Sequence, residues 1–244
     1  VQTKKDGTVH TGVGATPEDV MIVSGAAFFD FIGRTTSLYF PITEPLGTPG
    51  VYNGGVDAVA PTEFTYDVID RTTRIVMPSG LAQDTAYGFG DDRDGILRFE
   101  TIVTDLNGND THIFRDVTDL VTSVKEFLGN QEVWTSHGYN AMAELVSVAD
   151  DVGNVVTTTY DLVGRRTAIQ HPDTGLTEVV YDDASNVVAE ITENLRAAGQ
   201  QVTFQYDYGR MTGVQFPQNP GNNIAYFYGD AGSPFNRSGR VTMI

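Results

Sequence analysis

The chain has 244 residues and no cysteine, which excludes disulfide bonds and thiolate metal sites. It carries 15 Lys and Arg against 32 Asp and Glu, a net charge of −17, so it is expected to be repelled by phosphate backbones and anionic membrane surfaces. No apolar run approaches the ~20 residues of a transmembrane helix. We therefore expect neither nucleic acid as a partner nor membrane insertion by this segment.

The start of the chain differs from the rest. Residues 1–22 are polar and rich in Gly and Thr at their beginning, and we predict there an irregular segment or a strand that pairs with sequence absent from this chain. From residue 23 to 244 we predict strands and turns nearly throughout, as one repeat domain that continues beyond the chain. The Gly- and Pro-rich stretch 47–61 is interpreted as an insertion, and Asn194–Gly199 as one helical turn with Asn194 as its cap.

A short phrase recurs along the sequence. An aromatic residue and Asp are followed, after two further residues, by Gly-Arg or a near equivalent. Its turns are marked by Phe29, Asp30, Gly33 and Arg34; by Tyr66, Asp67 and Arg71; by Tyr160, Asp161, Gly164 and Arg165; by Tyr181 and Asp182; and by Tyr206, Asp207 and Arg210. Internal repetition of this kind indicates one small unit stacked many times rather than a single irregular core.

The residue types of the phrase predict a tight turn between two strands. In Asp161-Leu162-Val163-Gly164, Asp holds the first position of a type I turn and Gly holds the fourth, where φ is positive. Such a turn followed by a left-handed residue makes a three-residue hairpin with a bulge. Asp70, Asp119 and Ser185 replace this Gly in other copies, and Asp tolerates the left-handed region better than most residues. Ala143 does not fit, so we expect the turn at Asn140–Ala143 to differ.

The copies are regularly spaced in the second half of the chain. Phrase starts at Tyr139, Tyr160, Tyr181, Tyr206 and Tyr228 are separated by 21, 21, 25 and 22 residues. Half-steps at Asp105–Asn109 and Asp150–Asn154 leave room for one strand and one turn, so each full unit is a β-hairpin. The residues alone thus predict an all-β fold of repeated β-hairpins.

These residues resemble the Rhs or YD-repeat family, whose signature is Tyr-Asp, two variable residues and Gly-Arg, often followed by a Pro-Asp-Gly step. His171-Pro172-Asp173-Thr174-Gly175 and Met77-Pro78-Ser79-Gly80 match that later step. The resemblance covers nearly the whole chain from about residue 23, and the stretch Val23–Asp30 is similar to bacterial Rhs toxins and to the shell components of Tc-type insecticidal toxins. No part of the sequence matches the family's plug region or its self-cleaving aspartyl protease.

The resemblance implies a spiralling, shell-like (cocoon) β-sheet that encloses a C-terminal toxin polypeptide. It further implies adjoining parts of the same shell as partners, and a protein that is secreted or delivered by a bacterial secretion system. Because unpaired strand edges invite association, we expect the isolated chain to aggregate or to require neighbouring chains.

Candidate chemistry is weak by comparison. Asp105–Asn109 resembles the start of a calcium loop, but Asp110 stands where an EF-hand needs Gly, and the same phrase recurs as a repeat turn. Asp91–Gly95 and Asn219–Asn223 are predicted to be exposed loops. The four histidines, His10, His112, His137 and His171, show no metal-ligand spacing. We predict no cofactor, no metal site and no enzymatic activity.

Three hypotheses for the function follow, in order of preference. The first is a structural wall segment of an Rhs-type shell. The second is a carbohydrate-binding or adhesive module, which would expose the repeated tyrosine faces in a row. The third is an enzyme on a β-propeller, for which the 37-residue interval from Phe29 to Tyr66 argues and the 21-residue rhythm argues against.

Overall fold

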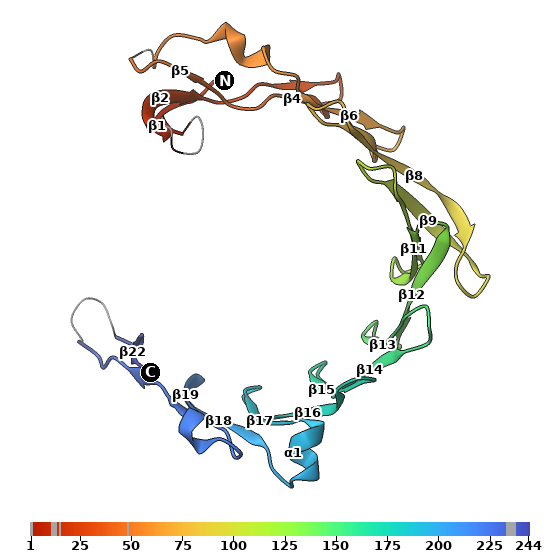
Figure 1. Cartoon of the computed structure of the whole chain (residues 1–244), viewed down its shortest axis with the longest axis vertical. Coiled ribbons are helices and arrows are strands. Elements are labelled where there is room, and N and C mark those ends of the chain that lie inside the picture. The colour runs from red at the N-terminus through yellow and green to blue at the C-terminus, as the bar shows by residue number, and fades with distance from the viewer. Residues whose placement is uncertain (1, 11–13, 15, 48, 233–237) are drawn as a thin grey trace. The chain divides into compact units, whose positions relative to one another are not determined.

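The structure, a computed structural model, describes residues 2–10, 14, 16–47, 49–232 and 238–244. Its contacts divide it into two compact units, Val1–Glu132 and Val133–Ile244. In both units the described residues form antiparallel strands joined by short turns (Figure 1). The predicted all-β fold of repeated hairpins is confirmed.

The first unit holds two sheets. The smaller has the order β1-β2-β5, with bounds Lys4–Val9, Glu18–Val23 and Ile42–Glu44. The larger runs through consecutive antiparallel pairs from β3 to β11, with bounds β3 Ala27–Phe29, β4 Thr35–Leu38, β6 Thr62–Tyr66, β7 Thr72–Val76, β8 Ala82–Asp91, β9 Leu97–Thr104, β10 Asp110–Arg115 and β11 Val121–Leu128. A 3₁₀ turn, Gly54–Asp57, lies in the segment between β5 and β6.

The second unit continues the same pattern. Its strands are β12 Gln131–Tyr139, which begins at the end of the first unit, β13 Leu145–Ala149, β14 Val155–Tyr160, β15 Arg166–His171, β16 Gly175–Tyr181, β17 Val187–Ile191, β18 Val202–Asp207, β19 Arg210–Gln215 and β20 Ile224–Ala225. A separate pair is formed by β21 Phe227–Tyr228 and β22 Val241–Met243. The helical elements are α1, Glu193–Ala197, and a 3₁₀ turn, Pro220–Asn222.

Consecutive strands are antiparallel, so the turns of each unit lie alternately at the two ends of the strands. We call these two rows of strand ends the two edges of the sheet. We call the edge that carries the aromatic-Asp phrase the motif edge. Its turns begin at Asp30, Asp67, Asp92 and Asp116 in the first unit and at Asn140, Asp161, Asp182 and Asp207 in the second. The opposite edge carries the turns whose left-handed residues are Gly80, Gly108 and Gly129 in the first unit and Gly153 and Gly175 in the second.

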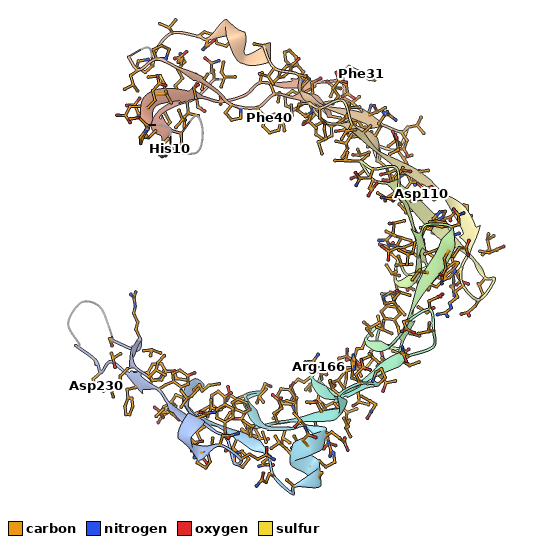
Figure 2. All side chains as sticks on the ribbon, in the orientation of Figure 1. His10, Phe31, Phe40, Asp110, Arg166 and Asp230 are labelled. Carbon is orange, nitrogen blue, oxygen red and sulfur yellow. The ribbon has the colours of Figure 1, made fainter. Side chains whose placement is uncertain are left out.

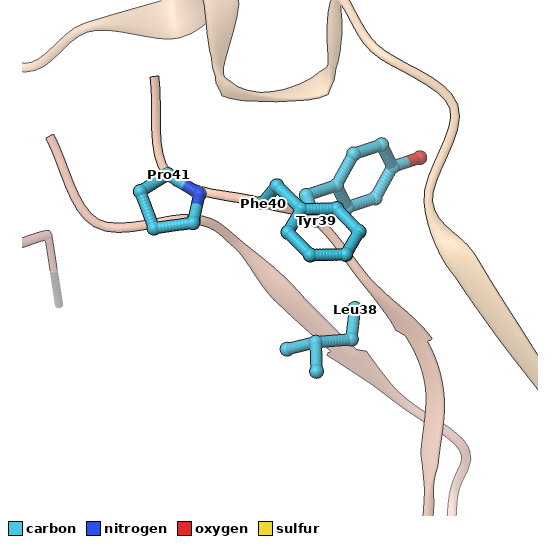
Figure 3. Close-up of a pocket in the computed structure, with 5 residues that line it drawn as sticks. Leu38, Tyr39, Phe40 and Pro41 are labelled. Carbon is cyan, nitrogen blue, oxygen red and sulfur yellow. The ribbon is translucent and has the colours of Figure 1, made fainter. Parts of the chain in front are cut away.

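Few side chains are fully buried, as expected when each hairpin packs mainly against its neighbours. Val23 of β2 and Phe114 of β10 are the largest apolar ones in the first unit, while Ala189, Leu195 and Val214 are buried in the second. An open apolar cavity of about 260 Å³ lies where the chain leaves β4, lined by Leu38, Tyr39, Phe40, Pro41 and Gly25 (Figure 3). A Cβ on Gly25 would lie 1.7 Å from the Tyr39 carbonyl oxygen, so only glycine fits there.

Three local predictions need correction or completion. The helical turn at α1 is present, but its N-cap is Thr192 rather than Asn194. β1 pairs with β2 inside the chain rather than with sequence outside it. Asp92, predicted to lie in an exposed loop, is buried and begins a turn. The division into 1–22 and 23–244 stays a prediction, and its residues 1, 11–13, 15, 48 and 233–237 lie outside the described ones.

Candidate structural site: the linked repeat turns

The carboxylate of Asp161 organises the turn that follows it. Its Oδ1 accepts the backbone N–H groups of Val163 at 3.0 Å and Arg165 at 2.9 Å, and its Oδ2 accepts Arg165 Nε–H at 2.7 Å. The backbone closes the loop, since Gly164 N–H donates to Asp161 O and Asp161 N–H donates to Arg165 O. Gly164 has φ 81°, and the strand register shifts at Thr159/Tyr160, which is the bulge that such a loop produces.

These hydrogen bonds favour the ionised carboxylate. The backbone N–H of Arg165, followed by its guanidinium, holds the pKa of Asp161 below its usual range in spite of partial desolvation. At Asp30, desolvation raises the pKa, but the guanidinium and backbone N–H of Arg34 outweigh it and the net pKa is lowered. The turn aspartates are therefore charged partners inside the turns rather than free surface acids.

The arginine that ends one turn also reaches the next turn along the motif edge. Arg165 Nη1–H donates to the Asp182 carbonyl oxygen at 3.3 Å and to Ser185 Oγ at 3.0 Å. Its guanidinium carbon lies 4.7 Å from the centre of the Tyr181 ring, a cation–π distance. One side chain thus holds its own turn and fixes the position of its neighbour.

The first unit repeats this geometry at Arg34. Its Nε–H donates to Asp30 Oδ2 at 2.6 Å, and its Nη1–H donates to the Asp67 carbonyl oxygen at 3.1 Å and pairs with Asp70 Oδ1 at 2.7 Å. The guanidinium carbon lies 4.9 Å from the Tyr66 ring centre. Since Asp70 and Ser185 hold equivalent positions, two unlike acceptors serve the same purpose.

A second link uses the tyrosine of the following turn. Its hydroxyl donates to the carbonyl oxygen of the residue directly after the arginine position of the preceding turn, over 2.7–3.1 Å. The pairs are Tyr66 to Thr35, Tyr87 to Thr72, Tyr160 to Leu145, Tyr181 to Arg166 and Tyr228 to Met211. The tyrosine ring stays half-buried between the two hairpins. We call this series of contacts the tyrosine ladder.

The ladder has no rung at Tyr206, where the sequence spacing lengthens to 25 residues. Helix α1 is inserted between β17 and β18, and the preceding turn ends in Asn186 rather than Arg. Among the described residues no hydrogen bond is formed by the Tyr206 hydroxyl. Burial, and after it the charge of Asp182, raises the pKa of Tyr206.

Sequence reasoning missed one complete rung. Tyr87 lies within β8 and is followed by Gly88, so it does not match the phrase, yet the Arg71 guanidinium carbon lies 3.9 Å from its ring centre. The missed turn begins five residues later at Asp92, whose Oδ2 accepts Arg98 Nε–H at 2.9 Å. The 21-residue interval from Tyr66 to Tyr87 was the signal that could have found it.

Two turns of the opposite edge, those at Asp105 and Asp150, use the same aspartate without the arginine. Asp105 Oδ1 accepts the N–H groups of Asn107 at 2.8 Å and Asn109 at 2.9 Å, and the Asn109 side-chain amide donates to Asp105 Oδ2 at 3.1 Å. Asp150 and Asn154 repeat this arrangement. The amide is too short to reach another hairpin. The carboxylate of Asp105 is occupied by its own turn, which supports the turn interpretation over a calcium loop.

The prediction that the turn at Ala143 would differ is wrong. Ala143 N–H donates to Asn140 O at 3.0 Å, and Asn140 Oδ1 accepts the N–H groups of Met142 and Glu144. Ala143 adopts φ 61°. The hydrogen bonds from Asn140 enforce the common turn on a residue that does not favour it.

Groups with possible chemistry are scattered in the described ranges. No cluster of three or more metal-ligating side chains occurs there, and no helix is long and apolar enough to cross a membrane. His112 Nδ1 lies 2.7 Å from Glu100 Oε1, and desolvation lowers the pKa of His137. Within the described residues, no hydrogen bond joins either histidine to a nucleophilic side chain. Figure 2 shows side chains projecting on both sides of the ribbon along the strands.

Comparison with known proteins defines the fold further. No family model and no curated protein sequence matches the chain. Among solved structures, the crystal structure of TcdB2-TccC3-TEV aligns with 92% of this chain at 18% identity and a TM-score of 0.68, and that of TcdB2-TccC3 with 98% at 17% identity and 0.66. The Photorhabdus luminescens Tc holotoxin pore with a TccC3 mutation aligns with 98% at 16% identity and 0.67. The chain spans only 12–13% of the length of these proteins, and the likeness shows a shared fold.

Proposed function

We propose that this chain is a structural wall segment of an Rhs-type shell that encloses a cargo, a C-terminal toxin polypeptide. Its partners are the adjoining parts of the same shell and the enclosed polypeptide, and the assembled protein is secreted or delivered by a bacterial secretion system. The segment acts by steric exclusion, without catalysis, cofactor, nucleic-acid binding or membrane insertion.

The tyrosine ladder, with its arginine links, is the observation that carries this proposal. A wall must keep neighbouring hairpins together over its whole extent, and backbone pairing alone leaves each hairpin free to slip or fray at its turn. Arg165 and Tyr181 pin adjacent turns by a hydrogen bond in each direction and a ring contact. The fold shared with the TcdB2-TccC3 structures supports the same conclusion.

The carbohydrate-binding alternative is disfavoured by the same contacts. A sugar-binding ladder needs open ring faces, because sugars stack on the face of an aromatic ring. The rings of Tyr66, Tyr87, Tyr181 and Tyr228 are instead covered by a guanidinium at 3.9–5.2 Å. We expect no binding on a glycan array.

Protease protection tests the proposed function. The native gene product that carries this chain would be digested with a nonspecific protease, with and without prior unfolding. If the chain belongs to an enclosing wall, a discrete polypeptide outside the repeat sequence survives digestion until the wall is unfolded. If every segment outside the repeats is cleaved at the same rate before and after unfolding, the proposal is wrong.

A further inference from the structure

Three polar side chains meet between the β1-β2-β5 sheet and the segment that follows it. The strands of this sheet lie side by side in Figure 1. The ammonium of Lys4, on β1, forms an ion pair with Oε1 of Glu44, on β5. The other carboxylate oxygen of Glu44, Oε2, accepts the side-chain amide Nδ2–H of Asn53 at 2.6 Å. One carboxylate thus bridges a primary amine and a carboxamide that are far apart in the sequence.

The meeting point is shielded from water. The side chain of Lys4 is 5% exposed and that of Glu44 is 12% exposed. The strand register places Val23 opposite Lys4 and Met21 opposite Glu44, and both of these apolar residues of the central strand β2 are buried. A dry site limits competing reactions with solvent, so a slow reaction between the groups inside it can run to completion.

Hydrogen bonds fix both the side chain and the backbone of Asn53. Its Oδ1 accepts the Gly55 N–H at 2.9 Å. The Gln2 amide clamps its backbone, since Asn53 N–H donates to Gln2 Oε1 at 2.8 Å and Gln2 Nε2–H donates to the Asn53 carbonyl oxygen at 3.0 Å. The Gly55 bond caps the 3₁₀ turn Gly54–Asp57, a task that Ser, Thr or Asp performs as well. Capping therefore does not explain the amide nitrogen, which is directed at Glu44.

An ordinary ion pair would account for the contact of Lys4 with Glu44 but not for the third group. Arg is the residue that suits a buried ion pair best, because its guanidinium presents five donors in a fixed fork. Lys, Glu and Asn together supply the parts of an amide exchange: an amine as nucleophile, a carboxylate that moves protons and a carboxamide as electrophile. The Gly55 N–H adds a donor at the oxygen on which negative charge develops.

We propose that Lys4 and Asn53 form an intramolecular isopeptide bond, with Glu44 as the catalytic carboxylate. Glu44 accepts a proton from the Lys4 ammonium, and the freed Nζ lone pair bonds to Asn53 Cγ while negative charge develops on Oδ1. Glu44 then protonates Nδ2, the Cγ–Nδ2 bond breaks and the carbonyl group forms again. The leaving ammonia takes the surplus proton from Nζ and departs as ammonium. One C–N bond thus replaces another, and no oxidant or reductant is consumed.

The bond ties an edge strand permanently into the fold. β1 stands at the end of the strand order β1-β2-β5, and local unpairing of a sheet begins at such edge positions. A covalent link from β1 to the segment after β5 prevents β1 from separating, because β2 lies between the two joined parts. The reaction occurs once per chain, so it adds to the proposed role in steric exclusion and does not depend on it.

Peptide mapping tests the proposal on the native gene product that carries this chain, purified in its folded state. After denaturation, trypsin cleaves after Lys and Arg, but not after a lysine whose amine has become an amide. We expect a branched species in which the peptide that ends at Lys5 is joined through Lys4 to peptide 35–71. Its mass is lower than the sum of the two peptides by one ammonia, about 17 Da. Recovery of only unlinked peptides, one of them ending at Lys4, would overturn the proposal.

Three variants of the same product, each checked for folding by circular dichroism, assign the reacting groups. Lys4→Arg keeps a positive charge beside Glu44 but offers no nucleophilic amine, so the linked peptide should disappear. Glu44→Gln should slow linking at least about a hundredfold after a pulse of synthesis, because the proton carrier is lost. Lys5→Arg, at the neighbouring exposed lysine of β1, is the matched control and should leave linking unchanged.

A link that survives Lys4→Arg, or linking that is as fast with Glu44→Gln as in the unsubstituted product, would overturn the proposal. Neither result would affect protease protection of the cargo, so the two proposals fail separately.

Discussion

Turns on the two edges share one backbone shape, but those on the motif edge also contact the neighbouring turn. On the motif edge, Asp161 and Arg165 close the turn and the arginine extends to Asp182 and Ser185 of the next. On the opposite edge, Asp150 and Asn154 close a turn of the same shape that contacts no other turn through the amide. The turn itself needs only an aspartate and a residue that accepts positive φ. Coupling between hairpins comes from the longer arginine side chain and from the tyrosine that follows it.

Acidification should have the largest effect, because it acts on the aspartates of both edges at once. The pKa values of Asp30, Asp67, Asp92, Asp105, Asp116, Asp150, Asp161 and Asp182 are all lowered in the folded chain. A lowered pKa gives stability that is present above the unfolded value of 3.8 and is lost as the pH falls through the folded value.

Urea unfolding measured between about pH 6 and pH 2 checks this prediction, and the midpoint should fall steeply below about pH 4. The edges should differ in their salt response. Asp161→Asn should reduce the salt dependence of the acid transition more than Asp150→Asn does, because only Asp161 faces a guanidinium. A midpoint that stays constant down to pH 2 would show that the carboxylates do not hold the turns.

Asp92→Ala should be the most harmful single substitution among these turns. Asp92 is 6% exposed and accepts two backbone N–H groups and Arg98 Nε–H, so its removal leaves three part-buried donors without this acceptor. We expect a loss of about 3 kcal/mol in the free energy of unfolding. Asp105→Ala on the opposite edge is the matched control, with a clearly smaller loss. Chemical denaturation of both variants makes the comparison, and equal losses would refute the distinction.

Tyr181→Phe removes one rung of the tyrosine ladder and little else. Its hydroxyl donates to the Arg166 carbonyl oxygen at 2.9 Å, so we expect a loss of about 1 kcal/mol. Tyr208→Phe is the control, because Tyr208 is 98% exposed, and it should change the stability by less than about 0.5 kcal/mol. If both variants match the unsubstituted chain in thermal unfolding, the ladder contributes nothing.

Ala143→Gly should have the smallest effect and the opposite sign. Ala143 adopts φ 61°, a conformation that glycine reaches without steric cost, so we expect a gain of about 0.5–1 kcal/mol. Gly164→Ala is the reverse test and should destabilise, because its Cβ would also lie 3.2 Å from Glu144 Oε1. A destabilising Ala143→Gly would show that the turn tolerates alanine for a reason other than strain.

The sequence predicted most of the turns because their chemistry is local. Asp161 and Gly164 specify a hairpin turn on their own, and hydrogen bonds within five residues complete it. Ala143 misled the prediction, since side-chain bonds from Asn140 supply what the residue at the left-handed position does not. Tyr87 and Asp92 escaped because they are separated by strand residues of an unusually long hairpin. The links between turns join residues 15 to 36 positions apart, and no local pattern shows which atoms meet.

A double-mutant cycle of Arg165→Ala and Tyr181→Leu tests most directly whether the motif edge couples neighbouring hairpins. Free energies of unfolding would be measured for the chain, both single variants and the double variant. Since the guanidinium carbon lies 4.7 Å from the ring centre, we predict a coupling energy of about 0.5–1 kcal/mol. Single effects that add to within about 0.3 kcal/mol would contradict the account, because the two turns would then be held by backbone pairing alone.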